Sequence, residues 1–204
     1  KKKKVKKTKK KVSIDKQNIV ISKLDFTLTN DQKKTLEEIN EDLSSSNKMF
    51  RLLQGDVGSG KTIVSLLSAF NTVNSGFQVA FMAPTEILAR QHYLLAEKLF
   101  DKNIRLELIS GKSTYKEKKN ILNNLSKHKI DIIFGTHAIF QKKVEFKKLG
   151  LIIIDEQHKF GVNQRKKLSD KGGKNCDILL MTATPIPRTL TMTIYGDMDL
   201  SIIY

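Results

Sequence analysis

Short apolar runs alternate with segments of helical periodicity along most of this chain. Several of these runs are continuous, without the polar residues that alternate along a half-exposed strand, which is typical of strands buried on both faces of a parallel sheet. The segment 63–73 has apolar residues spaced along one helical face, and helices of this kind would cover such a sheet. We therefore expect an α/β fold, a three-layered parallel sheet, with these strands: 50–53, 77–82, 104–109, 130–134, 151–154 and 178–181.

Polar or glycine-containing segments follow five of the predicted strands. Because the carboxyl ends of parallel strands meet at one edge of a sheet, we expect these segments to converge there and form the functional site. A further amphipathic helix is predicted from residue 28, with Leu36, Ile39 and Leu43 on one face. The five segments are 55–62, 83–85, 135–137, 155–156 and 182–184.

The strongest chemical signal is a glycine-rich segment that fits the phosphate-loop pattern G-x-x-x-x-G-K-[ST]. It follows an apolar strand, opens a helix and reads Gly55-Asp56-Val57-Gly58-Ser59-Gly60-Lys61-Thr62. Glycines let successive backbone N–H groups face the phosphates, and the helix adds its positive dipole end. We predict that Lys61 reaches the β and γ oxygens of ATP while the Thr62 hydroxyl binds Mg²⁺. The alternative is a glycine-rich turn that binds nothing.

The apolar strand 151–154 ends in two acids, Asp155 and Glu156, which is the layout of a Walker B element. Asp155 would hold the Mg²⁺ shared with Thr62, and Glu156 would orient and help deprotonate the attacking water. Two acids at a helix N-terminus are the structural alternative. A phosphate loop in the same chain favours the interpretation as metal ligand and catalytic base.

Gln32 has two interpretations that can hold together. Thr29-x-x-Gln32 fits a helix capping box, in which the glutamine satisfies a backbone N–H. Its amide also offers a donor and an acceptor, which could recognise the edge of adenine. Phe26 would then stack on the base.

The composition also indicates a polyanionic binding partner. The formal net charge is +16, and clustered lysines release counterions when they neutralise nucleic-acid phosphates. Nine of the first eleven residues are lysine, which leaves +7 for the rest of the chain. A run of this kind is usually a solvated, disordered arm and less often a dedicated DNA-binding or targeting segment. We predict that residues 1–23 form a lysine-rich tail or connector, disordered in part, and that 24–204 form the ATP-binding domain.

The remaining composition favours a cytoplasmic protein without a membrane partner. The single cysteine, Cys176, excludes an internal disulfide and a multi-thiolate zinc site, and it suits a reducing compartment. No apolar stretch approaches the ~18 residues needed to span a bilayer. His92 and His128 have no metal-ligand companions in the sequence, so we predict structural or surface roles for them.

Together these segments resemble, in order and spacing, the first motor domain of superfamily 2 helicases. The more specific resemblance, over about residues 24–204, is to the RecG family of ATP-dependent DNA helicases, and it rests on four segments: 82–89 (MAPTEILA), 155–165 (DEQHKFGVNQR), 182–190 (TATPIPRTL) and 195–200 (YGDMDL). Transcription-repair coupling factors are near relatives, but they usually have a glutamate where this chain has Gln157. Lys159 replaces the arginine common in both families, and lysine cannot reproduce a planar bidentate contact.

The resemblance implies a motor that remodels branched double-stranded DNA, such as stalled forks and Holliday junctions, in repair and recombination. It implies that Thr85 and Thr136 contact the DNA backbone, which gives register without sequence specificity. Arg90 is as consistent with an added DNA contact as with an exposed helix residue. His158 and the loop Thr182-Ala183-Thr184 would couple the γ-phosphate state to the grip on DNA; for the loop, a plain strand-end turn is the alternative.

Members of this family also have an N-terminal wedge domain and a second motor domain with arginine fingers, and we expect neither within 204 residues. Such an arginine contributes about 10³ to 10⁵ in rate, so we expect this fragment, as a monomer, to bind ATP but to hydrolyse it slowly. Two other interpretations stay open: the motor domain of a coupling-factor-like translocase, and a stand-alone P-loop switch module. The residues alone leave DNA and RNA open as substrates; the DNA assignment comes from the resemblance.

Overall fold

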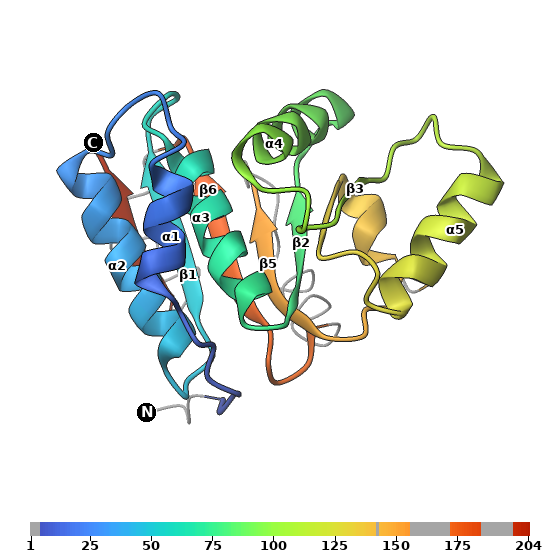
Figure 1. Cartoon of the computed structure of the whole chain (residues 1–204), viewed down its shortest axis with the longest axis horizontal. Coiled ribbons are helices and arrows are strands. Elements are labelled where there is room, and N and C mark those ends of the chain that lie inside the picture. Colours follow the sequence, from blue (N-terminus) through green and yellow to red (C-terminus); the bar gives the residue numbers. More distant parts are fainter. Residues whose placement is uncertain (1–4, 142, 156–171, 185–197) are drawn as a thin grey trace.

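The computed structural model describes residues 5–141, 143–155, 172–184 and 198–204. Within this part of the chain, seven strands form one sheet with the order β3-β4-β2-β5-β6-β1-β7 (Figure 1). All of their pairings are parallel, which confirms the predicted fold class. The strands are β1 (Phe50–Gly55), β2 (Gln78–Met82), β3 (Leu106–Leu108), β4 (Ile132–Gly135), β5 (Leu149–Ile154), β6 (Asp177–Thr182) and β7 (Asp199–Ile203).

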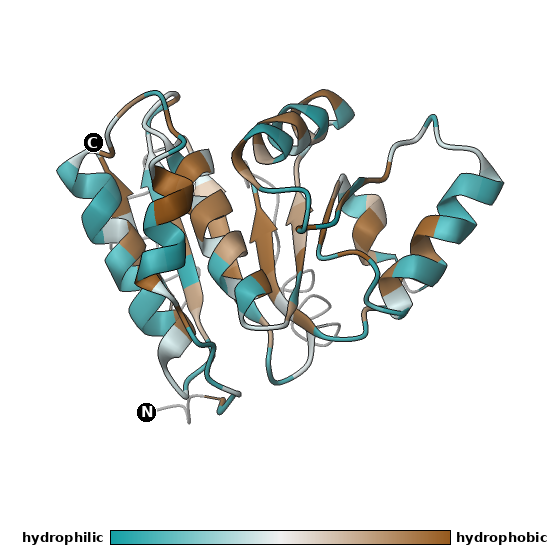
Figure 2. Ribbon diagram, in the orientation of Figure 1, coloured by the Kyte–Doolittle hydropathy of each residue, from teal (hydrophilic) through white to brown (hydrophobic). Residues whose placement is uncertain are grey.

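Helices cover both faces of the sheet. Successive side chains of a strand point to opposite faces, so the strands contribute to two apolar clusters, one on each face. On β2, Val79 and Phe81 belong to the cluster beneath α1 to α4, whereas Ala80 and Met82 belong to the cluster that includes residues of α5 and η1. Figure 2 shows apolar strands in the sheet and helices, such as α2, that are hydrophilic over much of their surface. The helices are α1 (Ile14–Ile21), α2 (Asn30–Ser44), α3 (Lys61–Asn74), α4 (Glu86–Leu99), α5 (Tyr115–Ser126) and the 3₁₀ helix η1 (His137–Phe140).

Apart from shifts of one or two residues at other strand ends, the strands differ from the sequence-based prediction at three places. Strand β3 is shorter than the predicted 104–109, and β7 was not predicted. Strand β5 begins at Leu149, ahead of the predicted 151, and therefore contains Gly150. A Cβ at Gly150 would lie 2.5 Å from Cβ of Phe77, so the strand can pass this aromatic side chain only with glycine there.

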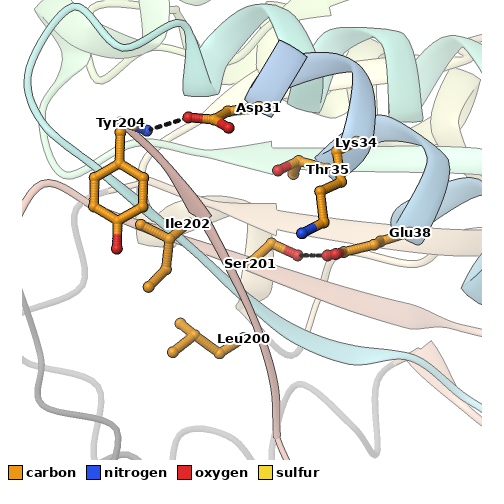
Figure 3. Close-up of a pocket in the computed structure, with 8 residues that line it drawn as sticks. All are labelled: Asp31, Lys34, Thr35, Glu38, Leu200, Ser201, Ile202 and Tyr204. Carbon is orange, nitrogen blue, oxygen red and sulfur yellow. Dashed lines mark hydrogen bonds between the residues drawn. The ribbon is translucent and has the colours of Figure 1, made fainter.

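Strand β7 is held against α2 by a polar network at the edge of the sheet. Arg51 donates to Glu38 at 3.0 Å and to Ser201 at 2.6 Å, and the Ser201 hydroxyl donates to Glu38. The backbone N–H of Tyr204 donates to Asp31 at 3.3 Å. Figure 3 shows the pocket between α2 and β7, whose lining includes Asp31, Glu38, Ser201 and Tyr204. Polar contacts with α2 therefore reinforce the attachment of this edge strand.

Lysines of the N-terminal segment pack against the domain. The Lys7 Nζ donates to both carboxylate oxygens of Asp177 at 2.8 and 2.6 Å, and Lys10 Nζ donates to one of them at 2.6 Å. All three side chains are fully buried. The backbone N–H of Met49 also donates to Asp177, at 2.7 Å. The expectation of a disordered arm is therefore wrong for residues 5–10, because a buried carboxylate at the start of β6 supplies the counter-charge that composition alone did not indicate.

Helix α1 precedes the predicted domain start at residue 24 but packs with the domain. The Gln17 Oε1 accepts hydrogen bonds from Asn40 of α2 at 2.9 Å and from Asn71 of α3 at 2.7 Å. Buried amides therefore tie the three helices together. Within the described residues, no helix combines the length and the apolar character needed to cross a membrane.

Candidate nucleotide-binding site

The segment 55–62 forms a tight loop between the end of β1 and the start of α3. Gly58 and Gly60 have φ angles of 85° and 86°, in the left-handed region that favours glycine. A Cβ at Gly60 would also lie 2.3 Å from the amide nitrogen of Gln32. The spacing of the glycines in the sequence thus reflects a backbone shape that other residues could not adopt without strain.

Lys61 folds back over this loop. Its Nζ donates to the backbone carbonyls of Gly55 at 2.6 Å and Asp56 at 2.7 Å, and only 8% of the residue is exposed. These carbonyls hold the ammonium inside the curve of the loop, next to the N-terminus of α3. A helix N-terminus favours anions, so the loop, the dipole and the ammonium together suit a phosphate.

Gln32 joins helix α2 to the phosphate loop. Its Oε1 accepts from the Thr29 N–H at 2.9 Å while Thr29 Oγ1 accepts from the Gln32 N–H at 3.2 Å, which confirms the capping box. The Gln32 Nε2 donates to the carbonyl of Ser59 at 2.8 Å. The amide therefore braces the loop. Recognition of adenine by Gln32 stays a prediction, and so does stacking by Phe26. Phe26 is 51% exposed and lines a pocket together with these residues: Ile21, Ser22, Leu24, Asp25, Thr27, Leu28 and Lys33.

Asp155 lies at the end of β5, where the predicted metal ligand should be. Its backbone N–H donates to Met82 at 2.9 Å, and its side chain is almost buried. Thr62 lies in the first turn of α3. Glu156 and His158 fall outside the described residues, so their predicted catalytic roles are not located.

His92, for which the sequence predicted a structural or surface role, contacts the predicted metal ligand. Its Nε2 lies 2.6 Å from Oδ2 of Asp155, and its ring contacts that of Phe81 at a centroid distance of 4.8 Å. The residue is buried, as a structural histidine would be, but its partner is the predicted Mg²⁺ ligand. Because 63 residues separate His92 and Asp155 in the sequence, no local pattern could have indicated this contact.

The predicted DNA-contact residues lie at the ends of neighbouring strands. The backbone N–H of Ala83 donates to Gly135 at 2.9 Å, which brings the ends of β2 and β4 together and places Thr85 and Thr136 just beyond them. Thr85 is exposed and caps α4 by accepting from the Leu88 N–H at 3.3 Å. Thr136 precedes η1 without a side-chain capping bond. Arg90 is exposed on α4.

An acid beside Thr85 anchors the next loop. The Glu86 carboxylate accepts hydrogen bonds from the N–H of Gly111 and the hydroxyl of Ser110. These two donors, the Gly111 N–H first, hold the pKa of Glu86 below its usual range. These hydrogen bonds connect the first turn of α4 to the loop after β3.

The loop 182–184 lies close to the phosphate loop in the sheet. Thr182 ends β6 opposite Gln54 of β1, and only 2% of it is exposed. Its Oγ1 accepts from the Thr184 N–H at 3.1 Å. A turn of this kind satisfies the alternative structural interpretation; coupling by residues 182–184 stays a prediction.

A glycine-rich loop that leads from a buried parallel strand into a helix, with a carboxylate at a nearby strand end, defines a P-loop nucleotide-binding domain. The family model for DEAD/DEAH box helicases matches residues 29–193. The chain belongs to the DEAD/DEAH box helicase family.

Within this family, the similarity is to RecG, as the motifs indicated. The chain is 54% identical over 180 residues to the ATP-dependent DNA helicase RecG of Streptococcus pneumoniae, covering 88% of this chain and 26% of that protein. It is 52% identical over 197 residues to RecG of Aquifex aeolicus, covering 95% and 25%. A solved structure of RecG bound to a three-way DNA junction superposes with a TM-score of 0.85 at 43% identity, covering 98% of this chain and 27% of that one. The chain thus spans about a quarter of the length of these relatives.

Proposed function

We propose that this chain is the first motor domain of a RecG-like, ATP-dependent DNA helicase that remodels branched double-stranded DNA in repair and recombination. The supporting observation is its similarity, over 98% of its length, to a RecG solved with a three-way DNA junction. The phosphate loop and the strand-end residues account for this activity chemically.

ATP and Mg²⁺ are the proposed cofactors. Asp155 and Thr62 would hold the metal, because Mg²⁺ prefers oxygen ligands and the side chains present are a carboxylate and a hydroxyl. His92 contacts Oδ2 of Asp155, so we propose Oδ1 as the oxygen that binds the metal. Held there, Mg²⁺ would offset the negative charge that develops on the phosphates during transfer. Lys61 would bind the same phosphates, with Glu156 orienting water and His158 linking the nucleotide state to DNA.

The DNA contacts proposed here come from the other strand ends. Thr85 and Thr136 offer hydroxyl and backbone groups to phosphates, and Arg90 adds charge. Such contacts carry no sequence information, which suits a protein that moves along DNA. The loop 182–184 lies between these contacts and the phosphate loop in strand order, and we propose that it couples them.

We further propose that a wedge domain and a second motor domain of the same protein complete the machine. Residues 1–23, whose Lys7 and helix α1 pack on the motor, would lead into it from the wedge. Residues 24–204 would bind ATP, and the whole would act as a cytoplasmic monomer. Since the second motor domain would supply the arginine fingers, the 204-residue chain alone should bind ATP and hydrolyse it slowly.

The test is ATP turnover by the full-length protein with a model fork, with linear duplex and without DNA. We expect branched DNA to stimulate turnover most and Lys61→Ala to abolish it, while Lys98→Ala, which removes an exposed lysine on α4, should keep it. Turnover that is independent of DNA would contradict the proposal and favour a nucleotide switch.

A further inference from the structure

The contact between His92 and Asp155 joins two motifs that the proposed function treats separately. His92 lies on α4, the helix capped by Thr85, whereas Asp155 ends β5. A carboxylate only accepts hydrogen bonds, so the histidine Nε2–H is the donor in this 2.6 Å contact. The bond occupies Oδ2 and fixes the plane of the carboxylate.

The contact lies on the buried face of α4. His92 lies in the buried stripe of the helix between Ala89 and Ala96, which are 1% and 0% exposed. These small residues let the helix approach the sheet closely, and the imidazole ring rests on Phe81 of β2. The histidine side chain therefore lies between α4, the Phe81 ring and the Asp155 carboxylate.

The same helix begins at the proposed DNA contact. Thr85 precedes His92 by seven residues, which is two turns and about 10 Å along the axis. A shift of α4 caused by DNA at Thr85 would therefore be delivered to the Asp155 carboxylate through one buried hydrogen bond.

We infer that His92 is a positioning residue: it orients Asp155 for the Mg²⁺ of Mg-ATP and transmits displacement of α4 between the DNA contact and the metal ligand. The inference deepens the proposed function and rests on it, since both the metal and the DNA contact belong to that proposal. Residues that hold a metal ligand in orientation typically change metal affinity or activity by about 10- to 100-fold when removed.

The first test measures nucleotide affinity of the full-length protein with a fluorescent ATP analogue, in Mg²⁺ and in EDTA. We expect His92→Ala to weaken binding about 10- to 100-fold in Mg²⁺ and to leave binding in EDTA unchanged. His92→Gln should restore most of the affinity, because its amide N–H can replace Nε2–H. A histidine that only filled the core would lower both affinities together, or neither, and that outcome would overturn the inference.

The variant Asp155→Ala distinguishes the role inferred for His92 from the proposed Mg²⁺ site itself. If Asp155→Ala removes the advantage of Mg²⁺ over EDTA but His92→Ala does not, the metal site stands and the role of His92 fails. If Asp155→Ala leaves that advantage intact, the proposed metal site itself is wrong. Circular dichroism of each variant checks that the domain is folded.

The second test concerns transmission. Binding of fork DNA and of Mg-ATP should change each other's affinity by the same factor, expected between about 5 and 150. We expect this factor to fall towards one in His92→Ala and to recover in His92→Gln. A wild-type factor in His92→Ala would show that the signal travels by another route.

Discussion

Removal of the buried carboxylate at the start of β6 should lower the free energy of unfolding of this domain more than a surface substitution does. Asp177 accepts hydrogen bonds from Lys7, Lys10 and the Met49 backbone, and its side chain and those of both lysines are fully buried. Asp177→Ala leaves these ammonium groups without their counter-charge. Breaking a buried pair in this way costs about 3–5 kcal/mol, a large share of the stability of a domain of this size.

Urea unfolding of the 204-residue chain, followed by circular dichroism at pH 7, measures this loss. The matched control is Asp101→Ala, which breaks the exposed pair between Lys23 and Asp101 and should cost at most about 1 kcal/mol. Replacing the whole cluster, as Lys7→Met, Lys10→Met and Asp177→Leu, should cost less than Asp177→Ala alone, because no charge is left buried. A loss below about 1 kcal/mol for Asp177→Ala would refute this account of the cluster.

The stability lost in Asp177→Ala should change with pH in a defined direction. Burial lowers the pKa of Lys7, and Asp177 acts against that effect by raising it. The folded state therefore binds the Lys7 proton less tightly than the unfolded state, so stability from this group increases as pH rises from its lowered pKa towards 10.5. Without Asp177 the pKa falls further, so the loss in Asp177→Ala, relative to wild type at the same pH, should be smaller at high pH than at pH 7. An equal loss at both pH values would contradict this reasoning.

Three further predictions concern single positions. Gly150→Ala should lower the free energy of unfolding by about 1–3 kcal/mol in the same urea assay, because its Cβ would meet Phe77; no change would mean that the aromatic ring can move aside. Gln32→Ala should weaken ATP binding in calorimetry and lower stability by about 1 kcal/mol, since it removes the contacts to Thr29 and Ser59; unchanged affinity would limit the glutamine to capping. Cys176 should resist a thiol reagent at pH 8 until urea unfolds the chain, because burial raises its pKa to about 12; rapid labelling of the folded chain would contradict its burial.

Local sequence patterns predicted most of the phosphate site and the fold class. The loop 55–62 could be predicted because its glycine spacing, its strand and its helix are all contiguous. The capping box at Thr29 and Gln32 is equally local, and the structure has it. By contrast, the bond from Gln32 to Ser59 depends on how α2 packs on the loop. No pattern within α2 indicates that packing.

Features that depend on distant partners could not be predicted in this way. The lysine-rich segment was expected to be solvated, since its composition does not reveal that Asp177, about 170 residues later, would bury two of its lysines. Strand β7 was missed because its burial alternates weakly and its position is set by β1 and by the polar network with α2. The contact between His92 and Asp155 likewise joins residues that are far apart in the sequence.

The order of strands has a consequence for how this domain is made on the ribosome. The strand that carries the phosphate loop, β1, is complete after residue 55, yet both of its neighbours in the sheet, β6 and β7, come from residues 177–203. Until those residues leave the exit tunnel, both edges of β1 lack their partner strands, and unpaired strand edges favour aggregation. A Cβ at Gly55 would lie 2.6 Å from the carbonyl of Ile203, so even the first residue of the loop is shaped by the last strand. Nucleotide binding should therefore appear abruptly, at the end of the synthesis of this domain.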